Sequence, residues 1–223
     1  NLHILHLVIV ILILIPALMY GQVRENCFEC EGNQATGYKS MATGLGNTVT
    51  GDYASAFGQN NFVSGTHSQV FGENSEATGN YSNIFGKNSI GTKNFSTVIG
   101  SWSKVEGMHS YVIGSFSKAK TNQNYIFGNS CIANNTSAFL VGHFLQSYAN
   151  NAFILGNGLI GDTLTNHNSY SLVVGFKSNI PTFYVGSSNG SGTTGRIGIG
   201  NVTAPEAKLH IRADENEDAA IML

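Results

Sequence analysis

The stretch SNIFGKNSIGTKNFSTVIGSWSKVEGMHSYVIG, residues 82–114, contains the repeat that decides the fold. Glycine recurs there every 14 residues at Gly86, Gly100 and Gly114, and a weaker series lies halfway between. Followed outward over residues 37–156, this phase has 18 positions, of which 14 are glycine. All four exceptions fall on alternate members of the series, so the true period is 14 residues, made of two unequal halves.

A repeating turn explains this period better than a helix does. Glycine costs a helix about 1 kcal/mol per residue relative to alanine, and the intervening segments are rich in Ser, Asn, Thr and β-branched residues. The pattern therefore predicts a coil of two short strands and two corners, with glycines at the corners. The turn glycines of the half that never loses its glycine are Gly44, Gly58, Gly72, Gly86, Gly100, Gly114, Gly128, Gly142 and Gly156.

The residues before each glycine indicate which way the strands face. Two positions before it, both halves place small apolar residues, which we expect to point into the coil. The neighbouring residue must then point outward. In the weak half it is mostly Thr or Ser, but in the strong half it is large and apolar. These outward residues are Phe57, Phe71, Phe85, Ile99, Ile113, Phe127, Val141 and Leu155.

A row of eight large apolar residues along one outer face is too much to leave in water. We call these eight residues the apolar stripe. Stacking coils in register makes the stripe continuous, and self-association about a symmetry axis covers it most simply. We therefore expect the stripe to be a subunit interface.

The segments SAFGQN, SNIFGKN, STVIGSWS and SYVIGSFS resemble the 14-residue head repeats of trimeric autotransporter adhesins, the YadA-like head. This resemblance covers roughly residues 35–160. It implies an all-β fold, a left-handed parallel β-roll of about nine 14-residue coils. It also implies a homotrimer in which three rolls pack side by side.

The two ends of the chain differ from the repeats. The run LVIVILILIPALMYGQ predicts a secretory signal helix cut near Gly21, with an uncleaved anchor as the alternative. Near the other end, GRIGIGNVTAPEAKLHI resembles a segment of Bacteroidetes surface proteins and phage tail fibres. The expected organisation is a signal peptide at 1–21, a linker at 22–34, the roll at 35–160, an irregular β neck at 161–196 and a truncated C-terminal module at 197–223.

Short motifs that resemble catalytic or cofactor-binding sequences are expected by chance in a chain with 27 glycines. GNGLIG at 156–161 fits a dinucleotide fingerprint but lacks a βαβ unit, and GSSNG at 186–190 lacks the strand-to-helix turn that a nucleophile at Ser188 needs. Cys27 and Cys30 form one CxxC pair, which is too few ligands for zinc, and a local disulfide and free thiols are the alternatives in an exported chain. We therefore expect no enzyme activity, no cofactor and no metal site.

The net charge of the chain and its individual His and Cys residues also give no indication of a nucleic-acid site or a reactive site. Net charge is −2, so nucleic-acid binding through a basic patch is not expected. His67, His109 and His143 are interpreted as solvated residues of the roll, and Cys131 as a small structural residue.

Three aromatic residues fall just after strong-half glycines, on predicted corners. They are Trp102, Phe116 and Phe144. Such residues could stack against a ligand or pack against a neighbouring subunit. Subunit packing is favoured, because aromatic residues are enriched in interface cores.

These observations predict a non-enzymatic bacterial adhesin, secreted to the cell surface and associated with the outer membrane. The expected partner is a host matrix protein, a glycan or another cell surface, bound multivalently, and contact with the membrane is limited to the signal segment. The alternatives are a tail-fibre shaft or receptor-binding protein of a phage, or a passive spacer. An ice-binding solenoid is excluded, because the threonine ladder that begins at Thr36 gives way to Glu106 and Lys120.

Overall fold

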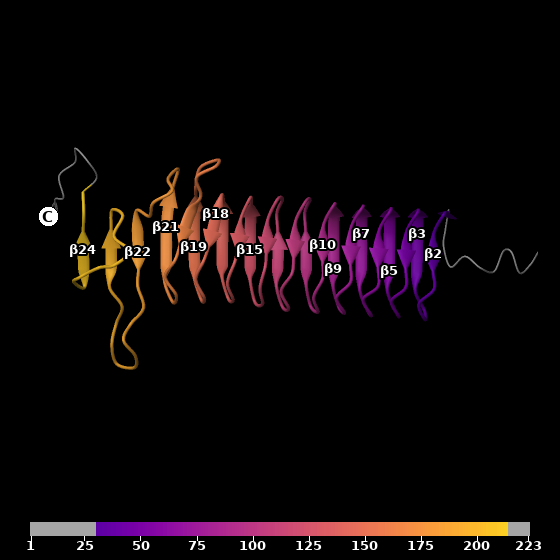
Figure 1. The fold of residues 1–223 in the computed structure, drawn as a ribbon, viewed down its shortest axis with the longest axis horizontal. Coiled ribbons are helices and arrows are strands. Elements are labelled where there is room, and N and C mark those ends of the chain that lie inside the picture. The colour runs from indigo at the N-terminus through magenta and orange to yellow at the C-terminus, as the bar shows by residue number, and fades with distance from the viewer. Residues whose placement is uncertain (1–29, 214–223) are drawn as a thin grey trace, which may run out of the picture.

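The computed structural model describes residues 30–213, which form a long β-solenoid and a short terminal meander (Figure 1). Each coil crosses a longer strand of one sheet and then a shorter strand of a second sheet. The described residues contain no helix, so the all-β prediction is confirmed. The predicted signal peptide and Cys27 lie outside the described residues.

The longer strands form one 14-stranded sheet, which we call the long sheet. Its strands are β1 (Cys30–Glu31), β3 (Met41–Leu45), β5 (Ser55–Gln59), β7 (Gln69–Glu73), β9 (Asn83–Lys87), β11 (Thr97–Ile99), β13 (Tyr111–Ile113), β15 (Tyr125–Asn129), β17 (Phe139–His143), β19 (Phe153–Asn157), β21 (Leu172–Phe176), β22 (Phe183–Val185), β23 (Ile197–Ile199) and β24 (Leu209–Ile211).

The shorter strands form a 10-stranded sheet, which we call the short sheet. Its strands are β2 (Gln34–Ala35), β4 (Thr48–Val49), β6 (Phe62–Val63), β8 (Glu76–Ala77), β10 (Ile90–Gly91), β12 (Lys104–Val105), β14 (Lys118–Ala119), β16 (Ile132–Ala133), β18 (Leu145–Ser147) and β20 (Leu164–Asn166).

The strands pair in parallel, and each residue faces the residue 14 positions later. Val98 pairs with Val112 in the long sheet, for example, and Val105 pairs with Ala119 in the short sheet. The period read from the sequence is therefore the register of both sheets.

The stack is longer than the nine coils predicted, because regular pairing extends beyond them at both ends. β1 precedes the repeats, and β21 follows them. After β19 the coil has five extra residues, so Gly156 pairs with Gly175 instead of with residue 170. The additional length forms a corner loop in which Leu159 and Asp162 bridge, and the strands on either side keep their alignment.

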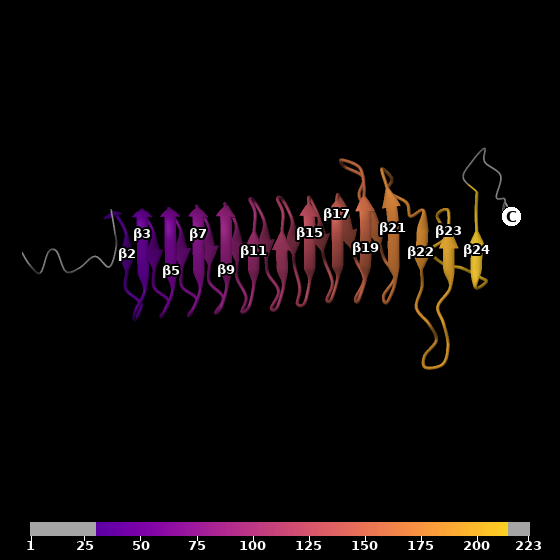
Figure 2. The same cartoon turned by 180° about the vertical axis from the view of Figure 1, so that it is seen from behind.

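Beyond β21 the topology changes. β22 pairs antiparallel with β21 and β23, and β24 then runs parallel to β23. Figure 2 shows this meander continuing the axis of the solenoid, with the loop between β22 and β23 projecting from one edge. No helix among residues 30–213 is long and apolar enough to cross a membrane.

The core is a narrow column of small apolar side chains between the two sheets. Long strands contribute residues such as Ile84, Val98 and Leu140, and short strands contribute Val63 and Val105, all fully buried. These are the positions two before each glycine, so the predicted inward face is confirmed. Period-two alternation sends the next side chain outward.

Buried serines flank this core and join one coil to the next. The Ser103 hydroxyl donates to the Gly114 carbonyl (3.0 Å) and accepts the Ser117 amide (3.2 Å). The same column contains Asn47 and Asn61 in earlier coils, where the amide side chains make equivalent bonds. All buried polar side-chain atoms among the described residues have a partner.

Cys131 takes the place of serine in this column, as predicted for a small structural residue. Its thiol donates to the Gly142 carbonyl (3.2 Å). Burial raises the pKa of the Cys131 thiol to about 11, so the group stays neutral near neutral pH. It thus acts as a weak donor within the stack.

Replacing Ser103 with alanine is expected to destabilise the solenoid by about 1–3 kcal/mol, because the change leaves the Ser117 amide and the Gly114 carbonyl without a partner. Thermal unfolding followed by circular dichroism measures the loss. Ser64→Ala, on the outward side of the short sheet, is the matched control and should be nearly neutral. Equal unfolding temperatures for the two variants would contradict the role of the serine column.

Seven of the nine predicted turn glycines lie within strands of the long sheet, while Gly100 and Gly114 follow their strands at a bend. Gly58 is the fourth residue of β5, and the corner comes two residues later at Asn60, which has a left-handed backbone (φ 53°). A Cβ atom on Gly58 would lie 2.0 Å from the Gly72 carbonyl oxygen of the next coil. Close stacking of coils therefore requires these glycines, and at seven of the nine a positive φ of 109–157° disfavours other residues as well. The left-handed corners two residues later are formed by Asn and other residues.

Candidate functional site

The apolar stripe lies on the outer surface of the long sheet. All eight residues belong to β5 through β19, in strand-to-strand register. The phenyl rings of Phe57 and Phe71 stack with centroids 4.6 Å apart, and those of Phe71 and Phe85 are 5.1 Å apart. Phe85 and Ile99 are 42% and 41% exposed in the single chain, far more than core residues. The stripe is thus a continuous uncovered apolar surface.

A second apolar column widens this surface in the C-terminal half. It stands two residues before the stripe on each strand and consists of Tyr111, Tyr125, Phe139 and Phe153. The Tyr111 and Tyr125 rings are 5.3 Å apart, and those of Phe139 and Phe153 are 4.8 Å apart. In the N-terminal half this column is polar, with Ser55 in the first of these strands.

One corner carries a stack of rings that the sequence analysis did not recognise. Tyr53, His67, Tyr81, Phe95 and His109 follow one another along the rod. Their ring centroids are 4.7–5.1 Å apart, and their planes are nearly parallel. Two of the histidines interpreted as merely solvated are therefore members of an aromatic stack. The stack ends where the second apolar column of the long sheet begins.

The opposite corner contains Trp102 and Phe116. Their rings are parallel within 4°, with centroids 6.5 Å apart, and both residues are more than half exposed. The two corners alternate along the chain, since one precedes each long strand and the other follows it. Phe144 occupies the same left-handed position two coils later.

The outer surface of the short sheet is mixed: it exposes Phe62 in an early coil and, further along, contains a small ion-pair cluster. The Glu106 carboxylate lies 2.8 Å from the Lys104 ammonium and 2.9 Å from the Lys118 ammonium. Burial acts to raise the pKa of the Glu106 carboxyl, but the two lysines outweigh burial and hold it below its usual range. The carboxylate therefore stays charged at neutral pH. The charged residues of these coils are thus on the short sheet, while the apolar stripe is on the long sheet.

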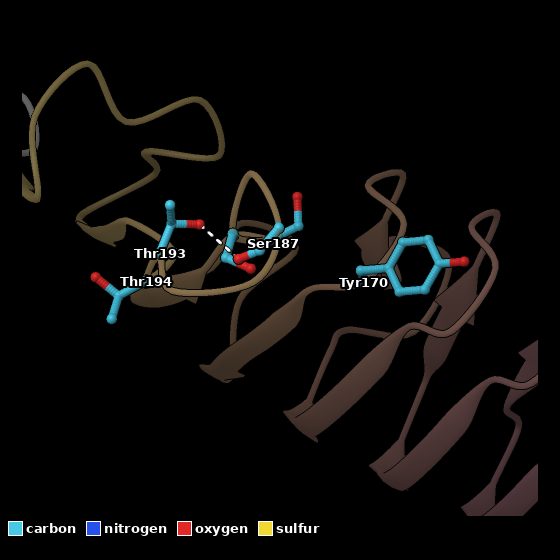
Figure 3. A pocket seen from close by; sticks show the side chains of 8 residues that line it. Tyr170, Ser187, Thr193 and Thr194 are labelled. Atoms are coloured by element: carbon cyan, nitrogen blue, oxygen red, sulfur yellow. Dashed lines mark hydrogen bonds between the residues drawn. The ribbon is translucent and has the colours of Figure 1, made fainter.

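The motifs weighed as catalytic do not converge with other reactive groups. GNGLIG runs from the end of β19 into the corner loop, and no helix follows it. Ser188 lies in the loop between β22 and β23, beside an open pocket lined by Tyr170, Ser187 and Thr193 (Figure 3). The Thr193 hydroxyl donates to the Gly190 carbonyl within the same loop (2.8 Å). Among residues 30–213, no three potential metal ligands lie together.

The fold and surface define a parallel β-solenoid with one apolar outer face. Residues 35–61 match the family described as the YadA head domain repeat, in two copies. Residues 35–61 therefore carry two YadA head repeats, and the strand register of these two copies continues through the later coils. No curated protein and no solved structure matches the chain.

Repeats of this family belong to trimeric autotransporter adhesins, which are surface-exposed outer membrane proteins. Such adhesins are homotrimers and are typically not enzymes. The apolar stripe is the surface of this chain that suits such an assembly.

Proposed function

We propose that this chain is the head or rod region of a bacterial cell-surface adhesin that assembles as a homotrimer through the apolar stripe. The observation that carries the proposal is the uninterrupted row of large apolar side chains on the long sheet. A soluble monomer rarely leaves a contiguous apolar patch of this kind uncovered. Three copies about one axis cover each other's stripes and leave the short sheets facing outward.

The rod has no chemistry of its own and acts by presenting a surface. Export through an N-terminal signal places it at the cell surface, associated with the outer membrane. The bound target is a matrix protein, a glycan or another cell. Because three copies repeat one site, avidity exceeds the affinity of a single site by about 10²–10⁴.

The test displays the full chain on a non-adherent bacterial cell and measures attachment to matrix proteins, immobilised glycans and other cells. Attachment or aggregation that disappears when the stripe is broken supports the proposal. If the displayed protein is trimeric but neither attachment nor aggregation occurs, the solenoid is a spacer, and the adhesin function assigned to it is wrong.

A further inference from the structure

Trp102 and Phe116 stand where earlier coils have asparagine, at a left-handed corner position of the kind that Tyr53 and Phe95 occupy at the other corner. Both have a left-handed backbone, with φ of 57° and 55°, in a column that holds Asn60, Asn74 and Asn88 in earlier coils. Asparagine adopts this conformation readily, whereas bulky residues rarely do. The two rings are 58% and 60% exposed, so they bury little within the chain. Their presence therefore suggests contact with another molecule.

Each of these rings is followed two residues later by a lysine on the short sheet. Lys104 and Lys118 are register partners on β12 and β14, and Lys120 follows on the same strand edge. Glu106 neutralises one of these three charges through its two ion pairs. Lys120 donates to the Asn134 side chain (2.7 Å), one coil further on. The cluster of three lysines and one glutamate carries a net charge of +2.

This cluster is the centre of a wider charge pattern along the rod. Residues 77–120 contain five lysines and one glutamate, for a net charge of +4, although the whole chain is slightly acidic. Residues 30–76 contain one lysine and four acids, for a net charge of −3, and residues 121–161 contain no Asp, Glu, Lys or Arg at all. Basic charge is therefore concentrated in the same coils as the two exposed rings.

The site stays accessible in the proposed assembly. The lysines project from the short sheet, while the apolar stripe projects from the long sheet, on the other side of the solenoid core. A trimer that covers the stripe leaves the short sheet facing solvent, and three copies of the cluster form a belt at one height of the rod. Trp102 and Phe116 lie at the corner that leads into the short sheet, so this inference replaces the sequence interpretation that they pack against a neighbouring subunit. This step of the inference rests on the proposed function.

We propose that Trp102, Phe116, Lys104, Lys118 and Lys120 form a binding site for an anionic polysaccharide, of the class that carries sulfate groups on successive sugars. The backbones of Lys104 and Lys118 are register partners one coil apart, about 4.8 Å, and Lys120 is two residues beyond Lys118, so the three side chains are close enough together to meet sulfates on successive sugars. The outer faces of the two rings are open, because Asn88 and Ser130 in the flanking coils are small. Apolar faces of sugar rings stack on such exposed aromatic surfaces.

A single-stranded nucleic acid is the competing polyanion, because bases also stack on aromatic rings. The geometry favours the polysaccharide. The Trp102 and Phe116 rings are parallel and repeat in coil register beside the lysines, an arrangement that suits a regular chain of charged sugars. Nucleic acid is therefore an outcome of the test below.

Trp102 is the only tryptophan in the chain, so its fluorescence reports directly on the site. A heparin-derived octasaccharide titrated into the full-length protein is expected to change the Trp102 emission saturably. The effect should weaken as salt is added, because ion pairs with sulfate are screened. Neutral dextran oligosaccharides should produce no change.

Two double variants that remove the same net charge distinguish binding at the lysine cluster from non-specific attraction by the overall charge of the protein. Lys104→Gln with Lys118→Gln is expected to weaken octasaccharide binding at least tenfold. Lys39→Gln with Lys177→Gln removes the same net charge elsewhere on the rod and should weaken it less than twofold. Trp102→Asn restores the residue type of earlier coils, so it should fold and lose affinity, measured by calorimetry.

Light scattering on the same samples keeps this inference distinguishable from the proposed function. A trimer that fails to bind the octasaccharide overturns the polysaccharide site and leaves the adhesin proposal standing. A monomer that binds it overturns the assembly and supports the site. Equal weakening in both lysine variants, or tighter binding of an oligothymidine of equal charge, overturns the proposal.

Discussion

A chain carrying Phe85→Asp together with Ile113→Asp is expected to run as a monomer in size-exclusion chromatography with light scattering, whereas the unchanged chain runs as a trimer. Both side chains lie in the apolar stripe, outside the buried core, and are about 40% exposed in the single chain, so the change leaves the core of each solenoid intact. At a subunit interface each buried apolar side chain contributes roughly 1.5–3 kcal/mol, and three copies lose it together. An unpaired buried carboxylate costs more again.

The matched control places the same two charges on the short sheet. Thr50→Asp with Thr78→Asp should leave the trimer intact, because both residues project from the opposite side of the core. Circular dichroism should show the same β content in both variants. A stable monomer for the unchanged chain would remove the basis of the assembly proposal.

Gly86→Ala is expected to be among the most destabilising single changes in the chain. A Cβ atom at this position would lie 1.7 Å from the Gly100 carbonyl oxygen and 2.7 Å from its carbon. The Gly100 amide also donates to the Phe85 carbonyl (2.9 Å), so β9 and β11 cannot separate without breaking their pairing. We expect a loss of about 3 kcal/mol or more, as in overpacked cores, measured by thermal or denaturant unfolding.

Gly190→Ala is a demanding control for this prediction. Gly190 has a positive φ of 123°, which disfavours alanine, but a Cβ atom there meets nothing within 4 Å. Its cost is therefore conformational strain alone. If Gly190→Ala destabilises the protein as much as Gly86→Ala does, close stacking of coils is not the reason for the regular spacing of glycines along the chain.

The parts of the fold that repeat could be predicted from the sequence. Alternation along a strand makes Val98 point inward once Ile99 points outward, and the 14-residue period fixes which residues are neighbours in the next coil. These two rules are enough for the core and for the position of the stripe. They act at every coil, so one irregular residue does not obscure them.

Features that depend on contacts between side chains or backbones of successive coils could not be predicted in this way. The ring stack at one corner passes through His67 and Phe95, but the same column holds Lys39, Gln123 and Ser137 in other coils. Residue type alone therefore does not mark it. The glycines were assigned to corners because glycine commonly forms turns. Only the distance to the next coil's carbonyl shows that stacking is their reason.

The continuation past residue 160 was hidden for a related reason. A search for glycines at a fixed 14-residue spacing ends at the five-residue extension, because every later residue number is shifted by five relative to the repeat. Pairing in space is unaffected, since Gly156 still meets Gly175. The antiparallel turn into β22 has no periodic signal, so only local hydrophobic alternation indicated strands there.

The lengthened coil after β19 also identifies where this scaffold accepts foreign sequence. Its extra residues leave at one corner and return without displacing Leu164 from register with Leu145. A peptide epitope spliced between Leu159 and Asp162 would therefore be carried on a closed loop while the neighbouring strands stay paired. Equivalent corners recur at each coil, so a series of such grafts would set epitopes at increments of about 4.8 Å along a rigid rod. The solenoid could therefore serve as a scaffold that fixes the distance between grafted vaccine epitopes or receptor-binding peptides.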